Sequence, residues 1–249
     1  MIPLIIHQIW FQGIKNIIQP YKNCFIKTIK FLENTNWDHY FWDQTRIENF
    51  IKTEYPNYWD CYNKCDILVQ KLDVARYLIL YHYGGCYMDM DMEILKDFKD
   101  LLDDDDELVF SLTKQLGYNN GILFSSKNNT FWLDFLKDVD RKINLLKFDD
   151  MLNIQFSTGP INFTIFINNN KNIYKIKSLP FKYLEPCESS YNTFITDEAY
   201  VINHYGNSWI SPFYKYFIKL YNNRNYIFFI LGVLLSIIFR SKINHYLKL

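Results

Sequence analysis

The chain has 249 residues, of which 49% are hydrophobic and 19% aromatic, and its 27 basic and 27 acidic side chains give a net charge of zero. This length suits one domain, or one domain with a short appendage. The balanced charge gives no reason to expect nucleic acid as a partner. The five cysteines form no Cys-x-x-Cys pair and no Cys/His spacing typical of a zinc site, so we expect reduced, buried thiols.

Strands and helices alternate through most of the chain. The apolar patterns predict strands over residues 3–11, 37–42, 86–90, 107–112 and 121–125. They predict helices over residues 21–33, 43–54, 66–82 and 130–146, and a further helix that opens at Thr158-Gly159-Pro160. Such alternation is typical of an α/β domain in which helices flank a mixed, mostly parallel sheet. Sheets of this kind bind ligands at the carboxyl ends of their strands.

The helix over residues 66–82 is followed by two glycines. Its apolar stripe consists of Leu68, Leu72, Ala75 and Ile79. We expect Gly84 and Gly85 to end the helix by adopting the positive φ that a helix C-terminus often requires.

The last segment differs in composition from the rest. Residues 226–239 carry no charge, which predicts a domain over residues 1–215 and a hydrophobic, membrane-associating helical segment over residues 216–249. The run is shorter than the roughly 20 apolar residues of a spanning helix, so an interfacial or a buried core helix is the alternative. The N-terminus shows no secretory signal, which favours a cytosolic catalytic domain on a membrane.

The strongest motif is Asp89-Met90-Asp91, directly after a short apolar strand. In an extended segment residues i and i+2 point to the same face, so Asp89 and Asp91 could present two carboxylates to one cation. Mg²⁺ and Mn²⁺ favour oxygen ligands and often complete their coordination with substrate phosphates. We therefore predict a metal-bound diphosphate here; two exposed turn aspartates are the alternative.

Asp73 and Arg76 are three residues apart on the preceding helix, and so share one helical face. The guanidinium fork of an arginine offers fixed donors to oxyanions such as phosphates. The alternative is an ordinary ion pair between the two side chains.

Three further segments agree with this motif in order and spacing: residues 2–10, Asn119-Asn120-Gly121 and His204-Tyr-Gly-Asn207-Ser-Trp209. Together with residues 73–91 they resemble the family 32 glycosyltransferases with a DXD sugar-binding region. That family includes initiating mannosyltransferases and mannosyl-inositolphosphoceramide synthases, and the clostridial glucosylating toxins are more distant relatives. The resemblance covers residues 2 to about 213. It implies a GT-A fold and a metal-dependent, configuration-retaining transferase that uses a nucleotide sugar.

The resemblance also implies roles for individual residues. Asp91 would be a metal ligand, Asp89 would reach the ribose or a metal-bound water, and His204 would complete the metal shell or contact the diphosphate. Asp73 and Arg76 would bind the donor sugar and its phosphates. For His204 a satisfied core histidine is the alternative.

Five other residues are expected to bind the donor. Trp10 would stack on the nucleotide base, with core packing as its alternative, and Asn120 and Gly121 would line the sugar or acceptor pocket. Asn207 and Trp209 stand where the toxins contact the diphosphate. The identities at 204 and 207 depart from the toxins, which leaves the roles at those two positions open.

The sequence therefore predicts a hexosyltransferase that uses Mn²⁺ or Mg²⁺ and moves a hexose from GDP-mannose or a UDP-hexose to a glycan, glycolipid or glycoprotein acceptor. Family resemblance favours a luminal location, in the Golgi or endoplasmic reticulum, over the cytosolic one. A glycosyltransferase-like binding protein without activity is one rival, against which the intact Asp73, Arg76, Asp89 and Asp91 argue. An Asp-x-Asp phosphohydrolase is another, disfavoured because Glu93 replaces the Thr or Val expected after such a motif.

Overall fold

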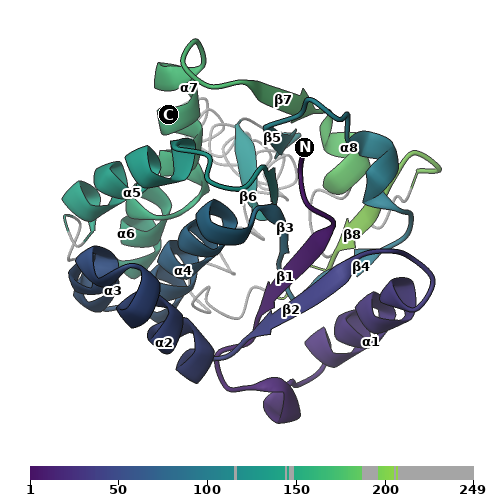
Figure 1. The fold of residues 1–249 in the computed structure, drawn as a ribbon, viewed down its shortest axis with the longest axis horizontal. Helices are drawn as coiled ribbons and strands as arrows, with labels where there is room; N and C mark the ends of the chain where they lie inside the picture. The colour runs from purple at the N-terminus through teal and green to yellow at the C-terminus, as the bar shows by residue number, and fades with distance from the viewer. Residues whose placement is uncertain (115–116, 144, 146–148, 187–195, 205, 207–249) are drawn as a thin grey trace, which may run out of the picture. The chain divides into compact units, whose positions relative to one another are not determined.

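A six-stranded mixed sheet forms the centre of the fold (Figure 1). The computed structural model describes residues 1–114, 117–143, 145, 149–186, 196–204 and 206, and the statements below concern these residues. The sheet has the strand order β2-β1-β3-β6-β5-β7. Its strands are β1 (Ile5–Ile9), β2 (Asp38–Trp42), β3 (Gly85–Met88), β5 (Leu108–Leu112), β6 (Tyr118–Ser125) and β7 (Ile176–Leu179).

Parallel pairing predominates in this sheet. The pairs β1–β2, β1–β3 and β5–β7 are parallel, whereas β6 runs antiparallel to both of its neighbours. The predicted α/β class with a mixed, mostly parallel sheet is therefore confirmed. Because β6 is antiparallel to β3, the beginning of β6 lies beside the end of β3.

Helices cover both faces of the sheet (Figure 1). The helices are α1 (Tyr21–Leu32), α2 (Gln44–Glu54), α3 (Trp59–Lys64), α4 (Leu68–Tyr83), α5 (Phe131–Lys142), α6 (Asp150–Ser157), α7 (Pro160–Asn170) and α8 (Phe181–Leu184). The larger apolar cluster joins one face of the sheet to α2, α3, α4, α5 and α7. The smaller cluster joins the other face to α1, α8 and a two-stranded sheet of β4 (Met92–Ile94) and β8 (Val201–Asn203).

The strands supply these two clusters alternately, as the two-residue period of a β-strand requires. In β6, Leu123 packs into the larger cluster, while Ile122 and Phe124 pack into the smaller one. In β3, Tyr87 faces the larger cluster and Cys86 the smaller. A central strand that is apolar on both faces is what a sheet covered on both sides demands.

Helix α4 ends as the two glycines predict. Gly84 has φ 67° and Gly85 has φ 89°. A Cβ atom on Gly85 would lie 2.5 Å from the carbonyl oxygen of Ile5, because β1 runs directly alongside β3. The predicted apolar stripe of α4 is right at Ala75 and Ile79, which are fully buried, but Leu68 at the start of the helix is 39% exposed.

The predicted C-terminal helix over residues 226–239 and the domain boundary after residue 215 lie outside the described residues. In the described part of the chain no helix is long and apolar enough to cross a membrane.

Candidate active site

The Asp-x-Asp motif lies in a tight turn at the carboxyl end of β3. Strand β3 ends at Met88, and the backbone N–H of Met92 donates to the carbonyl oxygen of Asp89 over 3.2 Å. The expectation of an extended segment is therefore wrong. The physical reason is that β4 begins at Met92 and pairs with β8 in a separate sheet, so that the chain must turn away from β3.

Asp89 is held by side chains and backbone of the main sheet. The hydroxyl of Tyr87 donates to its Oδ1 over 2.7 Å, and its own N–H donates to the carbonyl oxygen of Gly121 over 2.8 Å. Its side chain is 35% exposed. A Cβ atom on Gly121 would lie 2.7 Å from Oδ2 of Asp89, so only glycine fits there without a shift.

Helix α4 brings Asp73 and Arg76 to the same place, and both side chains are buried. The Nη2 atom of Arg76 lies 3.1 Å from Oδ1 of Asp73 and 3.4 Å from Oδ1 of Asp89, and Nη1 donates to the carbonyl oxygen of Asn120 over 2.7 Å. The guanidinium carbon lies 4.4 Å from the ring centre of Tyr87. The Nε–H of Arg76 is buried and has no hydrogen-bond partner among the described residues.

Burial raises the pKa of Asp73 to about 6, and the Arg76 charge and a hydrogen bond from Thr158 oppose that shift. The positive charge of Arg76 thus keeps two carboxylates close to it, one buried and one partly exposed. An arginine held in this way presents a fixed cation to any anion that reaches Asp89.

Asp91 is held by the closing segment of the domain. Its Oδ2 accepts a 2.8 Å hydrogen bond from the backbone N–H of Gly206, and its carbonyl oxygen accepts a 2.9 Å bond from the N–H of His204. Burial, and then the nearby charge of Asp89, raise the pKa of Asp91 to about 6. Asp89 and Asp91 are therefore close enough to repel one another.

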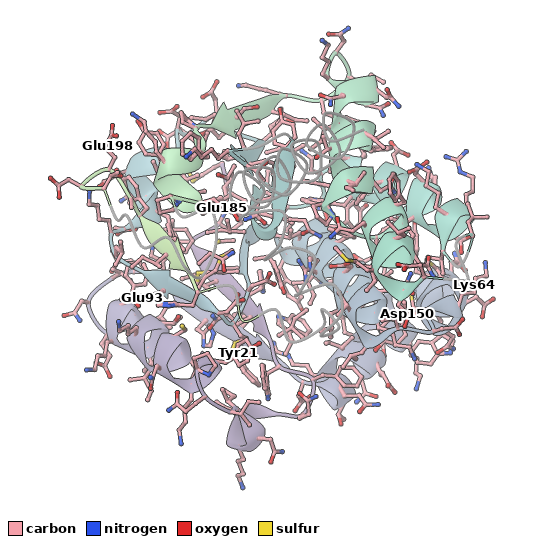
Figure 2. The ribbon with its side chains drawn as sticks, turned by 180° about the vertical axis from the view of Figure 1, so that it is seen from behind. Tyr21, Lys64, Glu93, Asp150, Glu185 and Glu198 are labelled. Carbon is pink, nitrogen blue, oxygen red and sulfur yellow. The ribbon has the colours of Figure 1, made fainter. Side chains whose placement is uncertain are left out.

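The side chain of His204 pairs with a neighbouring carboxylate. Its Nε2 lies 2.9 Å from Oε2 of Glu93, which also binds Lys27. Figure 2 labels Glu93 on β4 and Tyr21 at the start of α1. In the described ranges no group of three or more His, Cys, Asp or Glu side chains is arranged to hold a metal ion. The predicted role of His204 as a metal ligand stays a prediction.

Trp10 follows β1 and is half-buried near the same turn. Its ring centre lies 4.9 Å from that of Tyr21, and its Nε1–H donates to the carbonyl oxygen of Asn16 over 3.0 Å. It packs against a small cluster that includes Met90, the central residue of the motif. Stacking of Trp10 on a base stays a prediction. The predicted donor-binding residues Asn207 and Trp209 lie outside the described residues.

The fold adds two residues that the sequence interpretation missed, Tyr87 and Thr158. Tyr87 precedes Asp89 by two residues at the end of a strand, and this spacing could have indicated a shared face. Thr158 donates through Oγ1 to Oδ2 of Asp73 over 2.6 Å. The two residues are 85 positions apart in the chain, and no local pattern signals that contact.

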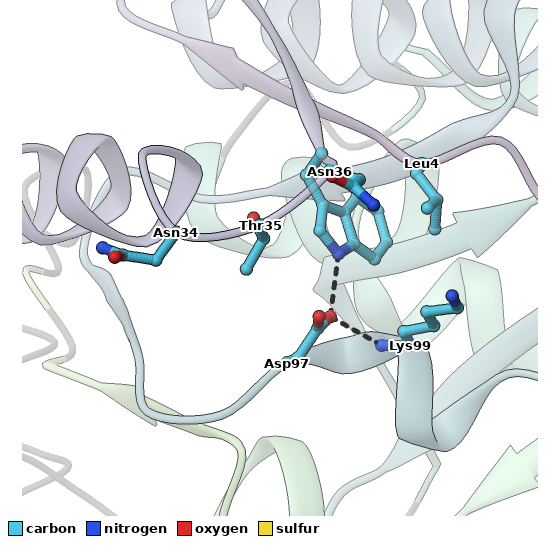
Figure 3. A pocket seen from close by; sticks show the side chains of 7 residues that line it. Leu4, Asn34, Thr35, Asn36, Asp97 and Lys99 are labelled. Carbon is cyan, nitrogen blue, oxygen red and sulfur yellow. Dashed lines mark hydrogen bonds between the residues drawn. The ribbon is translucent and has the colours of Figure 1, made fainter.

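A pocket of about 200 Å³ lies elsewhere, lined by Leu4, Asn34, Thr35, Asn36, Trp37, Asp97 and Lys99 (Figure 3). Leu4 and Trp37 precede the parallel strands β1 and β2, so the pocket lies at the opposite edge of the sheet from Asp89. Its volume is below the roughly 300 Å³ at which small-molecule sites begin. Within its lining, one carboxylate oxygen of Asp97 accepts hydrogen bonds from the Trp37 indole and the Lys99 backbone.

Comparison with known proteins agrees with this geometry. The family described as "Glycosyltransferase sugar-binding region containing DXD motif" matches residues 20–109. A glycosyltransferase of Acanthamoeba polyphaga mimivirus is 33% identical over 246 residues, which cover 93% of this chain and 92% of that protein. The chain therefore belongs to the DXD-motif glycosyltransferase family. It is an enzyme of the hexosyltransferase class, as the sequence predicts.

Fungal proteins and solved structures are more distant. Inositol phosphoceramide mannosyltransferase 1 of Schizosaccharomyces pombe is 29% identical over 161 residues, which cover 64% of this chain and 49% of that protein. This chain thus spans about half the length of the fungal relative. The PaToxG glycosyltransferase is 19% identical over 69% of this chain and 70% of its own, with a TM-score of 0.48. A glycosyltransferase involved in glycosylation of the major capsid of PBCV-1 is 11% identical over 80% and 92%, with a TM-score of 0.46.

Proposed function

We propose that this chain, in a GT-A-like fold, transfers a hexose from a nucleotide-diphosphate sugar to a hydroxyl of a glycan, glycolipid or glycoprotein, with retention of configuration. The observation that carries the proposal is the buried guanidinium of Arg76, fixed between Asp73 and Asp89 at the carboxyl end of β3. Its Nε–H lacks a partner among the described residues, and a buried N–H of this kind favours an incoming acceptor oxygen.

The donor set of the Asp89–Met92 turn fits a divalent metal ion. Burial raises the pKa of Asp91, the nearby charge of Asp89 raises it further, and a cation between the two carboxylates would relieve that repulsion. Carboxylate oxygens are ligands that Mn²⁺ and Mg²⁺ accept. Asp89 and Asp91 would hold the ion, with His204 a further candidate, and when bound it would neutralise charge on the donor diphosphate.

Different residues of the chain would contact the diphosphate, the sugar and the base of the donor. Arg76 would stabilise the charge that grows on the departing diphosphate, because its donors are fixed before the reaction begins. Asp73 would accept hydrogen bonds from hydroxyls of the donor sugar, and Trp10 would pack on the base. An oxygen of the departing phosphate would take the proton of the acceptor hydroxyl on the same face of the sugar, and retention follows from that geometry. Asn120, Gly121, Asn207 and Trp209 would complete the donor pocket.

The names of the fungal relatives support a mannosyl donor, which makes GDP-mannose the first candidate and a UDP-hexose the second. They also support a glycolipid acceptor. The uncharged run over residues 226–239 supports association with a membrane, on which such an acceptor would lie.

The test is donor turnover over a panel of UDP- and GDP-sugars, with and without Mn²⁺, beside an Asp91→Asn variant. We expect one sugar nucleotide to be turned over, in a reaction that needs the metal and is lost in the variant. Addition of a glycolipid acceptor should divert the sugar from water to lipid. Failure to bind any nucleotide in the presence of metal would contradict the proposal and favour a binding protein without activity.

A further inference from the structure

Five residues form a closed ring of polar contacts beside Asp89. Its members come from α4, from β6 and from the turn between α6 and α7. In order around the ring they are Asp73, Arg76, Asn120, Tyr77 and Thr158. The contacts are Asp73 Oδ1 to Arg76 Nη2 (3.1 Å), Arg76 Nη1 to Asn120 O (2.7 Å), Asn120 Nδ2 to Tyr77 Oη (3.2 Å), Tyr77 Oη to Thr158 O (2.7 Å) and Thr158 Oγ1 to Asp73 Oδ2 (2.6 Å).

Thr158 joins this ring through two separate atoms. Its side-chain hydroxyl donates to Asp73, and its backbone carbonyl accepts from Tyr77. Thr158 is fully buried, and the adjacent Ser157 accepts a 3.0 Å hydrogen bond from Nε2 of Gln70. The end of α6 and the turn that follows it are thus bound to one face of α4 at three positions along that helix, Gln70, Asp73 and Tyr77.

The consequence is a fixed orientation for the Asp73 carboxylate. Arg76 binds one oxygen and Thr158 the other. Arg76 itself has additional supports that do not pass through Thr158, namely the carbonyl of Asn120 and the Asp89 carboxylate. Loss of the Thr158 hydroxyl would therefore free one oxygen of Asp73, so that the carboxylate can rotate, and leave Arg76 in place.

We propose that Thr158 is a positioning residue of the transfer reaction, which orients Asp73 toward the hydroxyls of the donor sugar. This inference rests on the proposed function. It assigns to the α6–α7 turn a part in recognition of the sugar, as distinct from the nucleoside diphosphate. A sugar hydroxyl needs a correctly directed acceptor, since hydrogen bonds weaken steeply when their angle is poor.

The test compares three variants of the full chain, Thr158→Val, Thr158→Ser and Thr28→Val, and Thr158→Ala takes the place of Thr158→Val if the valine variant does not fold. Thr28 is a matched control, because it is also fully buried and its hydroxyl donates to the carbonyl oxygen of Cys24 within α1, away from the ring. Two quantities are measured for each: kcat/KM for the sugar nucleotide that the donor panel identifies, and Kd for UDP and GDP alone.

We expect T158V to lower kcat/KM by roughly 10- to 100-fold, the range for a lost hydrogen bond to a charged group. Its Kd for the nucleoside diphosphate should change less than about twofold, because Arg76 keeps its other supports. T158S restores the hydroxyl and should recover at least about a third of the activity. T28V should match the unaltered chain in both quantities.

Three results would overturn the positioning role. In the first, T158V keeps the kcat/KM of T28V. In the second, T158V weakens UDP or GDP binding as much as it weakens turnover, which indicates a structural role. In the third, neither T158V nor Thr158→Ala folds, as judged by circular dichroism. No turnover and no nucleotide binding by the unaltered chain would instead overturn the proposed function, and the positioning role with it.

Discussion

The two carboxylates of the Asp-x-Asp turn are held by different parts of the molecule. Asp89 is fixed by Tyr87 and Arg76, side chains that are themselves buried against the large helical layer. Asp91 is fixed mainly by backbone N–H groups of the segment that follows β8. One carboxylate thus depends on the identity of its neighbours, and the other depends on the path of a backbone. The site thus has an Asp89 half, formed by Asp89 with Tyr87 and Arg76, and an Asp91 half, formed by Asp91 with the segment that follows β8. Substitutions should affect the two halves in different ways.

The largest effect is expected when the support of Asp89 is removed. Arg76→Gln leaves Asp73 buried without its cation, and loss of one partner of a buried pair costs about 3–5 kcal/mol. Donor turnover should fall by at least ~10²-fold, since a fixed charge near the leaving group is lost. Urea unfolding and kcat/KM measure the two losses.

A matched control is Arg141→Gln on α5, whose side chain is 74% exposed. Such a surface change should stay within about 0.5 kcal/mol. If R76Q were as stable and as active as R141Q, the Asp89 half would not depend on its buried cation.

The second-largest effect is expected when the backbone support of Asp91 is disturbed. A Cβ atom on Gly206 would collide with the hydroxyl of Tyr21 and lie 2.6 Å from its Cζ, so Gly206→Ala must shift either the closing segment or the Tyr21 ring. We expect stability to fall by about 1–3 kcal/mol, the usual cost of overpacking, and metal-dependent turnover to fall about tenfold or more. A Tyr21→Leu change removes the clashing atoms and should restore part of the activity in the double variant. No rescue would mean that the clash is not the cause.

A smaller effect is expected from a substitution that alters the orientation of Asp89 without removing the charge of Arg76. Tyr87→Phe keeps the ring that packs on Arg76 and removes only the hydroxyl that donates to Asp89. We expect a loss of about 1–2 kcal/mol of transition-state stabilisation, or roughly tenfold in kcat, with little change in Kd for the nucleotide. Steady-state kinetics and calorimetric titration measure the two quantities. A large change in nucleotide affinity would assign Tyr87 to donor binding.

The smallest effect at neutral pH is expected at His7 of β1, which supports the end of α4 just before β3 begins. The Nε2 atom of His7 lies 2.9 Å from the carbonyl oxygen of Gly84, and Nδ1 accepts a bond from the Trp42 indole, which the neutral ring satisfies. Burial lowers the pKa of His7 to about 3, whereas a histidine in the unfolded chain titrates near 6.5.

The unfolded chain therefore binds more protons between these two pH values. The contribution of His7 to the free energy of unfolding is complete above pH ~6.5. It is lost as the pH falls toward 3, by at most about 1.4 kcal/mol per pH unit. Asp73 and Asp91 act in the opposite direction, because their raised pKa values destabilise the fold as the pH rises through about 6. Both the unaltered chain and His7→Gln contain the two aspartates. Their contribution therefore drops out of the difference in unfolding free energy between these two proteins. We expect that difference to shrink on acidification; a constant difference would contradict the assignment.

Local sequence patterns predicted the elements that set up the Asp89 half. The α4 stripe, the Gly84-Gly85 break and the apolar run of β3 are all contained in residues 66–90, so periodicity was enough to place them. The Asp91 half could not be predicted in this way. Its β4 and β8 strands have three residues each and lie more than a hundred positions apart, so that neither shows a strand pattern of its own. The turn at Asp89 was missed for the same reason, because it follows from that distant pairing.

The pairing of β4 with β8 also fixes an order of events during synthesis. Gly206 follows Asp91 by 115 residues. At the roughly 5–20 residues per second of translation, the Asp89 surroundings leave the ribosome on the order of ten seconds before the segment that anchors Asp91. A nascent chain thus has a supported Asp89 before a supported Asp91, because Asp91 is anchored only when β8, the last strand among the described residues, pairs with β4. The support of Asp91 is in this sense a late step of folding, set by a contact between residues 115 positions apart.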